Sequence, residues 1–245
     1  ALNEWNATES KSYLLEITAA LFSYSEENGP FIDLIKDQAS NKGTGAWATA
    51  AANALAYPNT LTASALHARF ISAFKTDRET YAHTFGDYAQ SLDLSLSELK
   101  KSYDLSRWIN HHQGFELLSA ANKTYKWTIE LNEVANVWAE GCIIKSTLLE
   151  QCIKHFEKNR SLLLSEPFYE LLKSGKAAWK KTLQQAINSE IAVPCVQAAW
   201  TTFSALKSKE SSANLIQAQR DFFGAHGFER IDQSDEGLQH GPWSQ

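Results

Sequence analysis

Apolar residues recur along most of this 245-residue chain at intervals of three and four positions, the spacing of one face of an α-helix. Tyr13, Leu14, Ile17 and Leu21 form one such set. No stretch of five or more residues alternates as a half-buried strand would, and only five prolines interrupt the chain. These patterns predict an all-α fold. Further helices are predicted over residues 46–56, 61–85, 96–110, 113–125, 131–158, 167–187, 193–207 and 213–223.

Polar segments that contain glycine or proline separate the predicted helices. Asn6 and Glu9 are spaced as a capping pair before the first helix, and residues 25–30 end it. Residues 227–245 read as a polar tail that is either disordered or held against another surface. Because the chain has no internal repeat and no low-complexity linker, we predict one helical domain over 1–226, followed by a tail over 227–245.

The overall charge limits the classes of partner. Lys and Arg number 23 against 28 Asp and Glu, a formal net charge of −5, which argues against nucleic acid as the main partner. No apolar run approaches the roughly 20 residues that cross a bilayer, and the first residues lack the apolar core of a secretory signal. Cys142 and Cys152 would lie about 15 Å apart if one helix carries both. Reduced thiols and a cytoplasmic location are therefore expected.

Lys42-Gly43-Thr44-Gly45 stands at the start of a predicted helix. Two glycines let backbone N–H groups converge, the helix start adds partial positive charge, and Lys42 and Thr44 add a cation and a hydroxyl. That chemistry suits a phosphate, although the spacing is not that of a P-loop. An ordinary glycine turn is the alternative interpretation.

Three other polar groups have structural as well as functional interpretations. Arg69 lies among apolar residues, where an ion pair with Asp77 or Glu79 would explain it. Arg220 and His226 lie near the end of the last helix, where a cation is stabilising for purely structural reasons. Neighbouring helical residues point about 100° apart, so His111-His112 is interpreted as a surface pair. No metal site is predicted.

Several long blocks resemble the C-terminal domain of the decarboxylating 6-phosphogluconate dehydrogenase family. The resemblance runs nearly from end to end, and its last block is the most specific. The blocks begin with Glu4-Trp5-Asn6 and continue with 13–18, 41–47, Ala68-Arg69, Gln113-Gly114-Phe115, 141–146 and 213–226.

The resemblance implies a role for each of five residues. Lys42, Thr44 and Arg69 match residues that hold the substrate phosphate, while Arg220 and His226 match a pair that reaches the neighbouring subunit's site. It further implies a homodimer with shared active sites and a tail, through His240 and Trp243, that threads through the partner subunit. Ala46, where the family often has lysine, is a departure outside the phosphate set.

The implied reaction converts 6-phosphogluconate to ribulose 5-phosphate with NADP, in the pentose phosphate pathway. The family's NADP domain and its catalytic lysine and glutamate lie upstream of the matching region, and this chain has no Gly-x-Gly-x-x-Gly or Lys-x-x-His-Asn motif. We therefore expect no catalytic residue in this chain. A non-catalytic dimerisation or phosphosugar-binding module, and a scaffold without a ligand, stay open as alternatives.

Overall fold

A computed structural model describes residues 1–27, 29–87, 91–157, 161–233 and 237–243. The described residues form eleven α-helices, two short 3-10 helices and one pair of two-residue strands, which confirms the all-α prediction. The chain divides into two compact units, Ala1–Thr202 (unit 1) and Phe203–Gln245 (unit 2), and each is described by itself.

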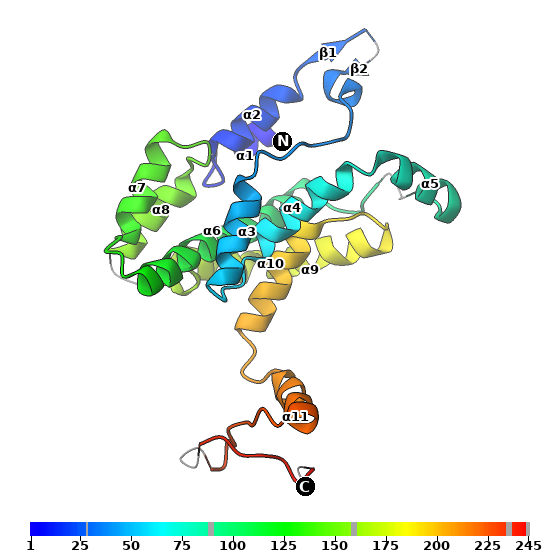
Figure 1. Ribbon diagram of the computed structural model, residues 1–245. Coiled ribbons are helices and arrows are strands. Elements are labelled where there is room, and N and C mark those ends of the chain that lie inside the picture. The colour runs from blue at the N-terminus through cyan, green and yellow to red at the C-terminus, as the bar shows by residue number, and fades with distance from the viewer. Residues whose placement is uncertain (28, 88–90, 158–160, 234–236, 244–245) are drawn as a thin grey trace. The chain divides into compact units, whose positions relative to one another are not determined.

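Unit 1 holds nine complete helices, labelled in Figure 1. In chain order they are α1 (Leu2–Trp5), α2 (Tyr13–Leu21), α3 (Thr44–Ala54), α4 (Thr60–Ser72), α5 (Lys75–Phe85), α6 (Leu96–Tyr125), α7 (Leu131–Gly141), α8 (Thr147–Phe156) and α9 (Glu166–Asn188). The antiparallel strands β1 (Ser25–Glu26) and β2 (Gly29–Pro30) and the 3-10 helix η1 (Phe31–Leu34) follow α2, and η2 (Leu162–Leu164) precedes α9. The unit boundary falls within α10 (Pro194–Leu206), and α11 (Ala213–Gly224) belongs to unit 2.

Several predicted helix boundaries were wrong. The segment 61–85 forms two helices, α4 and α5, and 131–158 forms α7 and α8, with Lys158 outside the described residues. Conversely, 96–110 and 113–125 belong to one helix of 30 residues. The capping pair was also wrong: Ser12 caps α2 by accepting from the Leu15 N–H, while Asn6 accepts from the backbone N–H of Ser12.

The core of unit 1 lies where α6 packs along α9 (Figure 1). Leu105, Ile109 and Phe115 of α6 and Trp179 of α9 are at most 1% exposed. Gly175 of α9 allows the close approach, because a Cβ there would lie 3.1 Å from a Leu105 methyl carbon. Leu105 and Ile109 lie four positions apart on one face of α6, and Phe115 lies six positions further on, so α6 is buried on more than one side.

His111 and His112 are not a surface pair, so that prediction was wrong. His112 is buried at 6% exposure, and the His111 ring Nδ1 lies 2.9 Å from the Arg107 carbonyl oxygen. Burial lowers the pKa of each ring to about 4. The 100° between neighbouring helical residues argues against one shared ion but does not place either ring at the surface, and packing of the continuous helix α6 buries His112.

The cysteines are reduced as predicted, although Cys142 and Cys152 do not share a helix. Cys142 follows the end of α7 and Cys152 lies in α8, so no single helix carries both. All three cysteines are free thiols. Burial raises the pKa of the Cys152 thiol to about 12, which makes it unreactive.

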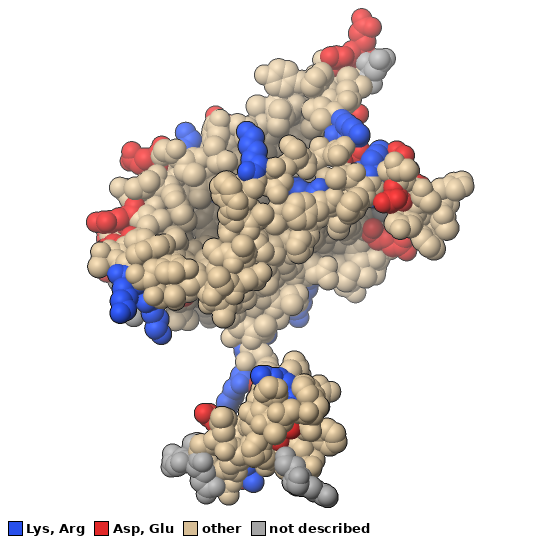
Figure 2. Space-filling view, in the orientation of Figure 1, with Lys and Arg blue, Asp and Glu red and all other residues tan. Residues whose placement is uncertain are grey.

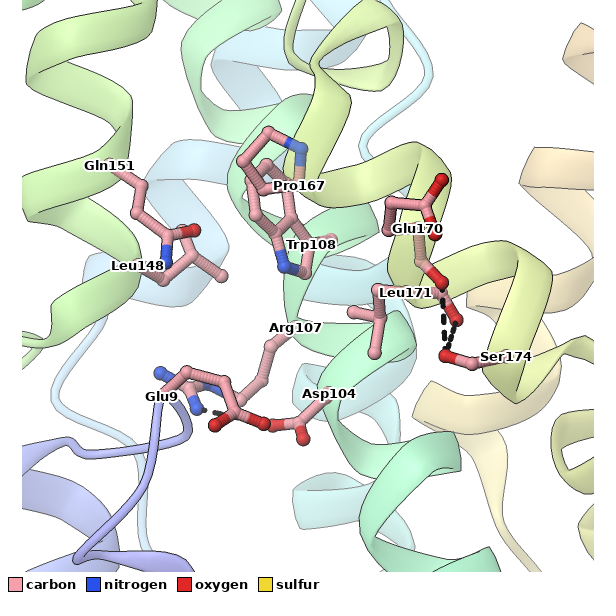
Figure 3. Close-up of a pocket in the computed structure, with 10 residues that line it drawn as sticks. All are labelled: Glu9, Asp104, Arg107, Trp108, Leu148, Gln151, Pro167, Glu170, Leu171 and Ser174. Atoms are coloured by element: carbon pink, nitrogen blue, oxygen red, sulfur yellow. Dashed lines mark hydrogen bonds and ion pairs between the residues drawn. The ribbon is translucent and has the colours of Figure 1, made fainter.

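A charged cluster joins the segment before α2 to α6 (Figure 3). Asp104 accepts hydrogen bonds from Ser10 Oγ at 2.7 Å and Lys100 Nζ at 3.0 Å, and Arg107 donates to the Ser10 carbonyl at 2.7 Å. In Figure 3, Glu9, Asp104 and Arg107 face one another at one end of a pocket of about 350 Å³ beneath Trp108. Because these charges compensate one another, the cluster accounts for how α2 is held and leaves no unpaired cation for an anionic ligand.

Candidate functional site

The loop that leads into α3 takes its shape from Gly43. This glycine has φ +97°, in the left-handed region, and a Cβ on it would lie 3.3 Å from the Trp47 ring. The Asn41 side-chain oxygen accepts from the Gly43 N–H at 2.6 Å and closes the turn. No side chain caps α3, so its first N–H groups stay available at the helix start.

A second set of bonds fixes the segment before this turn. Asp37 accepts from Arg78 Nη1 at 2.8 Å and lies 2.9 Å from Lys75 Nζ, which together hold its pKa well below the usual range. The Ala39 N–H donates to Ser72 Oγ at 3.0 Å. Residues 37–39 are thus held against the end of α4 and the start of α5, before the chain turns into α3.

Gln113 of α6 positions α4, which carries Arg69. Its side-chain oxygen accepts from the Leu61 N–H at 3.1 Å, and its amide donates to Thr60 Oγ1 at 2.9 Å. The side chain of Asn59, the N-cap residue, makes no capping hydrogen bond. Gln113, from α6, therefore caps the start of α4 instead. Leu66 then packs beside Gly45 of α3, which brings Arg69, one turn later, to the same end of the helix pair.

Arg69 lines a shallow pocket of about 380 Å³ together with residues 38–41. Lys36 and Phe70 also contribute to its wall, and no carboxylate does. Lys36 escaped the sequence analysis because it lies outside the glycine motif, and only its proximity to Lys42 in the sequence could have drawn attention to it. Two cations, the Ser40 hydroxyl and side-chain amides form a surface that suits an anion.

The ion pair considered for Arg69 is not formed. Within the described ranges its guanidinium makes no hydrogen bond or ion pair, and Glu79 lies 3.6 Å from Lys75 instead. Lys42 and Thr44 are exposed at the start of α3, and neither belongs to the wall of the Arg69 pocket. The structure therefore brings Arg69 beside the segment that ends at Lys42, while a shared phosphate contact for all three residues stays a prediction.

Arg220 and His226 belong to unit 2, where hydrogen bonds lead from Arg220 to Gly227, the residue after His226. Gln217 accepts from Arg220 Nη1 at 3.1 Å and donates to the Gly227 carbonyl at 2.6 Å. His226 follows the end of α11, and its ring lies edge-on to Phe223 with centroids 6.1 Å apart. Both predicted residues are exposed. Whether they meet the residues of unit 1, from this chain or a second copy, stays a prediction.

Three other kinds of feature bear on the choice of site: a basic surface, a metal site and a membrane-spanning helix. On the face drawn in Figure 2, Lys and Arg occur singly or in small groups, with no continuous basic surface among the residues shown. In the described part of the chain, His, Cys, Asp and Glu form no group of three that could hold a metal ion. No described helix is both long and apolar enough to cross a bilayer.

The described residues contain no dinucleotide-binding unit. Their only strands are β1 and β2, which are two residues long and antiparallel, so they contain no parallel strand–helix unit of the kind that binds a dinucleotide. The chemistry that the Arg69 pocket supports is the holding of an anionic group.

Comparisons with known proteins agree with this fold and with the position of the motifs. A family model described as "6-phosphogluconate dehydrogenase, C-terminal domain" matches residues 1–243. The decarboxylating 6-phosphogluconate dehydrogenase of Haemophilus ducreyi is 35% identical over 98% of this chain and 51% of its own length. The corresponding protein of Escherichia coli K12 is 33% identical, with 98% and 53% covered.

A solved structure matches equally well. Plasmodium falciparum 6-phosphogluconate dehydrogenase, described in its apo form and in complexes with NADP+ and with 6-phosphogluconate, superposes with a TM-score of 0.92 at 31% identity. The match covers 99% of this chain and 54% of that one. The chain thus spans about half the length of the relatives that it matches. With a family match over nearly every residue and the same helical fold, the chain belongs to the 6-phosphogluconate dehydrogenase family and corresponds to its C-terminal domain.

Proposed function

We propose that this chain supplies the phosphate-binding part of the substrate site, and the dimer contacts, of a decarboxylating 6-phosphogluconate dehydrogenase. The observation that carries the proposal is Arg69, whose guanidinium has no partner among the described residues and lines a pocket with residues 38–41, where no described carboxylate contributes. A structural arginine would have a partner, whereas a ligand-binding one is left free until the ligand arrives.

The proposed site combines complementary kinds of phosphate contact. Arg69 can offer two parallel N–H donors to one phosphate, Lys42 adds a mobile positive charge, and Thr44 adds a hydroxyl at the uncapped start of α3. Holding the phosphate at one end fixes the position of the sugar carbons at the other, which is how such a domain contributes to the reaction rate. The hydride acceptor, NADP, has no binding unit in the described residues, so oxidation and decarboxylation require residues beyond those described.

Arg220 and His226 would complete the site of a second copy, with the tail reaching across the same contact. Exposed apolar side chains in unit 2 support a partner: Leu215, Ile216, Phe222 and Phe223 are 58–74% exposed. A unit of this size rarely leaves so much apolar surface in water without a covering surface. The free thiols support a reducing compartment such as the cytoplasm.

Binding of 6-phosphogluconate, compared with gluconate, tests the site. We expect the chain to bind the phosphorylated sugar weakly and gluconate undetectably in isothermal titration calorimetry. Arg69→Ala and Lys42→Ala should each weaken binding by about tenfold or more, because each removes a charge-assisted bond. Lys173→Ala removes an exposed cation whose only close partner among the described residues is Glu170, so it is the matched control. Equal affinity in the Arg69, Lys42 and Lys173 variants would exclude the proposed site.

The homodimer has a separate test. Native mass spectrometry of the chain at micromolar concentration should give twice the monomer mass. Replacing Phe222 and Phe223 together by serine should shift the population toward monomer, because both rings are exposed within one copy. A wild-type chain that is monomeric under these conditions would contradict the shared site.

A further inference from the structure

The centre of unit 2 is a carboxylate that receives four donors. Asp221 is 1% exposed. Its Oδ1 accepts from the Gly227 N–H at 2.9 Å and lies 2.6 Å from His240 Nδ1. Its Oδ2 accepts from the Gly241 N–H and from Trp243 Nε1, both at 2.9 Å. These four donors hold the pKa of Asp221 well below the usual range for a carboxyl group.

Two of the bonds to Asp221 lie on either side of His226. The Asp221 backbone carbonyl accepts from the Ala225 N–H at 2.8 Å, and the Asp221 side chain accepts from the Gly227 N–H. Ala225 has φ +51°, a left-handed conformation that is unfavourable for a residue with a Cβ. The backbone bond would form with any residue at position 221, whereas the bond from the Gly227 N–H requires the Asp221 carboxylate, which therefore helps to hold the turn that presents His226.

The same carboxylate holds the C-terminal tail. His240, Gly241 and Trp243 all lie against it, although they are 19 to 22 residues further along the chain. Gln217 extends the network on the other side, since it connects Arg220 to the Gly227 carbonyl. Asp221 thus lies between the tail and the two residues that the proposed function assigns to a neighbouring site.

We infer that Asp221 is a positioning residue that couples docking of the C-terminal tail to the placement of His226 and Arg220. The expected effect on 6-phosphogluconate binding rests on the proposed function. The coupling between the tail and the turn at 224–227 involves residues of unit 2 alone. With the tail docked, both carboxylate oxygens are occupied and the turn at 224–227 is fixed. Without residues 240–243, Oδ2 loses both of its donors and Oδ1 keeps only the Gly227 N–H.

The proposed coupling predicts how Asp221→Asn and deletion of residues 240–245 combine in their effect on binding. Asp221→Asn replaces one acceptor oxygen by a donor amide that faces N–H groups, so the bonds to Gly227 and Gly241 cannot both form. Deletion of 240–245 removes the tail donors and leaves Asp221. If the two act through one coupling, each alone should weaken 6-phosphogluconate binding by about tenfold, and both together should weaken it no further.

Hydrogen exchange of the whole 245-residue chain supplies a readout that does not depend on the ligand. Asp221→Asn should raise the exchange rate of the Gly227 amide by about tenfold or more, and the tail deletion should do so only when Asp221 is present. Asp232→Asn is the matched control, because Asp232 is an exposed carboxylate of the same unit that pairs with nearby Arg230. Asp232→Asn should leave both binding and the Gly227 amide unchanged.

The outcomes separate the inference from the proposed function. Normal binding and normal Gly227 exchange in Asp221→Asn would overturn the inference and leave the proposed function intact. Additive effects of the two changes would also overturn it, since they would show that Asp221 and the tail act independently. If the wild-type chain fails to bind 6-phosphogluconate, the proposed function falls, and the exchange measurements alone decide whether Asp221 couples the tail to the turn.

Discussion

The interior of unit 1 and the interior of unit 2 are stabilised by different kinds of contact. Unit 1 packs apolar side chains of α6 and α9 inside, and even its buried histidines are neutral. Unit 2 has a charged carboxylate at its centre, while Phe222 and Phe223 stay exposed. The first arrangement is an apolar core between two long helices. The second is typical of a segment whose apolar side chains are covered by another surface.

Lowering the pH should produce the largest difference between the units. The pKa of His111 and of His112 is about 4 in the folded chain, below the unfolded value of 6.5. Their contribution to the unfolding free energy is complete above pH 6.5 and decreases as the pH falls toward 4, by on the order of 3 kcal/mol per ring. Glu116, whose pKa burial raises, opposes part of this loss. The pKa of Asp221 is lowered, so its bonds should persist over this range.

Urea unfolding of unit 1 between pH 7 and pH 4.5, with amide exchange at Gly241 for unit 2, would measure this difference. The double variant His111→Gln, His112→Gln should flatten the pH dependence of unit 1, because it removes both titrating rings. A profile that stays equally steep in that variant would show that other groups cause the acid sensitivity.

The next largest effect is expected from Trp179→Ala. Trp179 is fully buried and lies edge-on to Trp200 at 5.2 Å between ring centroids. Its loss should reduce the unfolding free energy by about 3–5 kcal/mol in a urea titration. Amides of unit 2 should keep their exchange rates under native conditions. Simultaneous loss of protection at Gly227 and Gly241 would mean that the units fold as one, and the comparison between them would fail.

A smaller effect should come from Gly175→Val, which tests the contact between α6 and α9. The added Cβ would lie 3.1 Å from Leu105 and 3.3 Å from Lys101, so the helices must move apart. We expect a loss of about 1–3 kcal/mol, measured by the urea midpoint. Gly114→Val makes the same change on α6, where no side chain lies within 4 Å of the new Cβ. Equal effects of the two variants would show that helix propensity, rather than packing, accounts for the loss.

The sequence predicted the helical class and the best separated helices because periodicity is a local property. It missed the break at Ala73 and Phe74, where both residues are compatible with a helix and Arg78 instead bonds to the Ser72 carbonyl and to Asp37. It also divided α6 at the two histidines, since their burial depends on packing against residues far away in the chain. Both errors involve contacts with residues far away in the chain, such as the bond between Arg78 and Asp37.

The candidate site was predictable to a similar degree. The glycine turn before α3 is a local signal, and the structure has it with Gly43 in the left-handed region. The role of Gln113 in capping α4 has no local signal, because its partners Thr60 and Leu61 lie more than 50 positions away. The Asp221 network joins positions 217 to 243 through hydrogen bonds, and an acidic residue beside Arg220 gives no indication of it.

The unbroken course of α6 also restricts how this domain can vary in length. Asp104 and Arg107 hold the segment before α2, and Gln113 holds α4, all from one helix. One residue inserted between Arg107 and Gln113 would rotate one set of contacts by about 100° and shift it by about 1.5 Å relative to the other. Insertions and deletions should therefore be tolerated in the turn after α6, around Lys126, and selected against within 104–113.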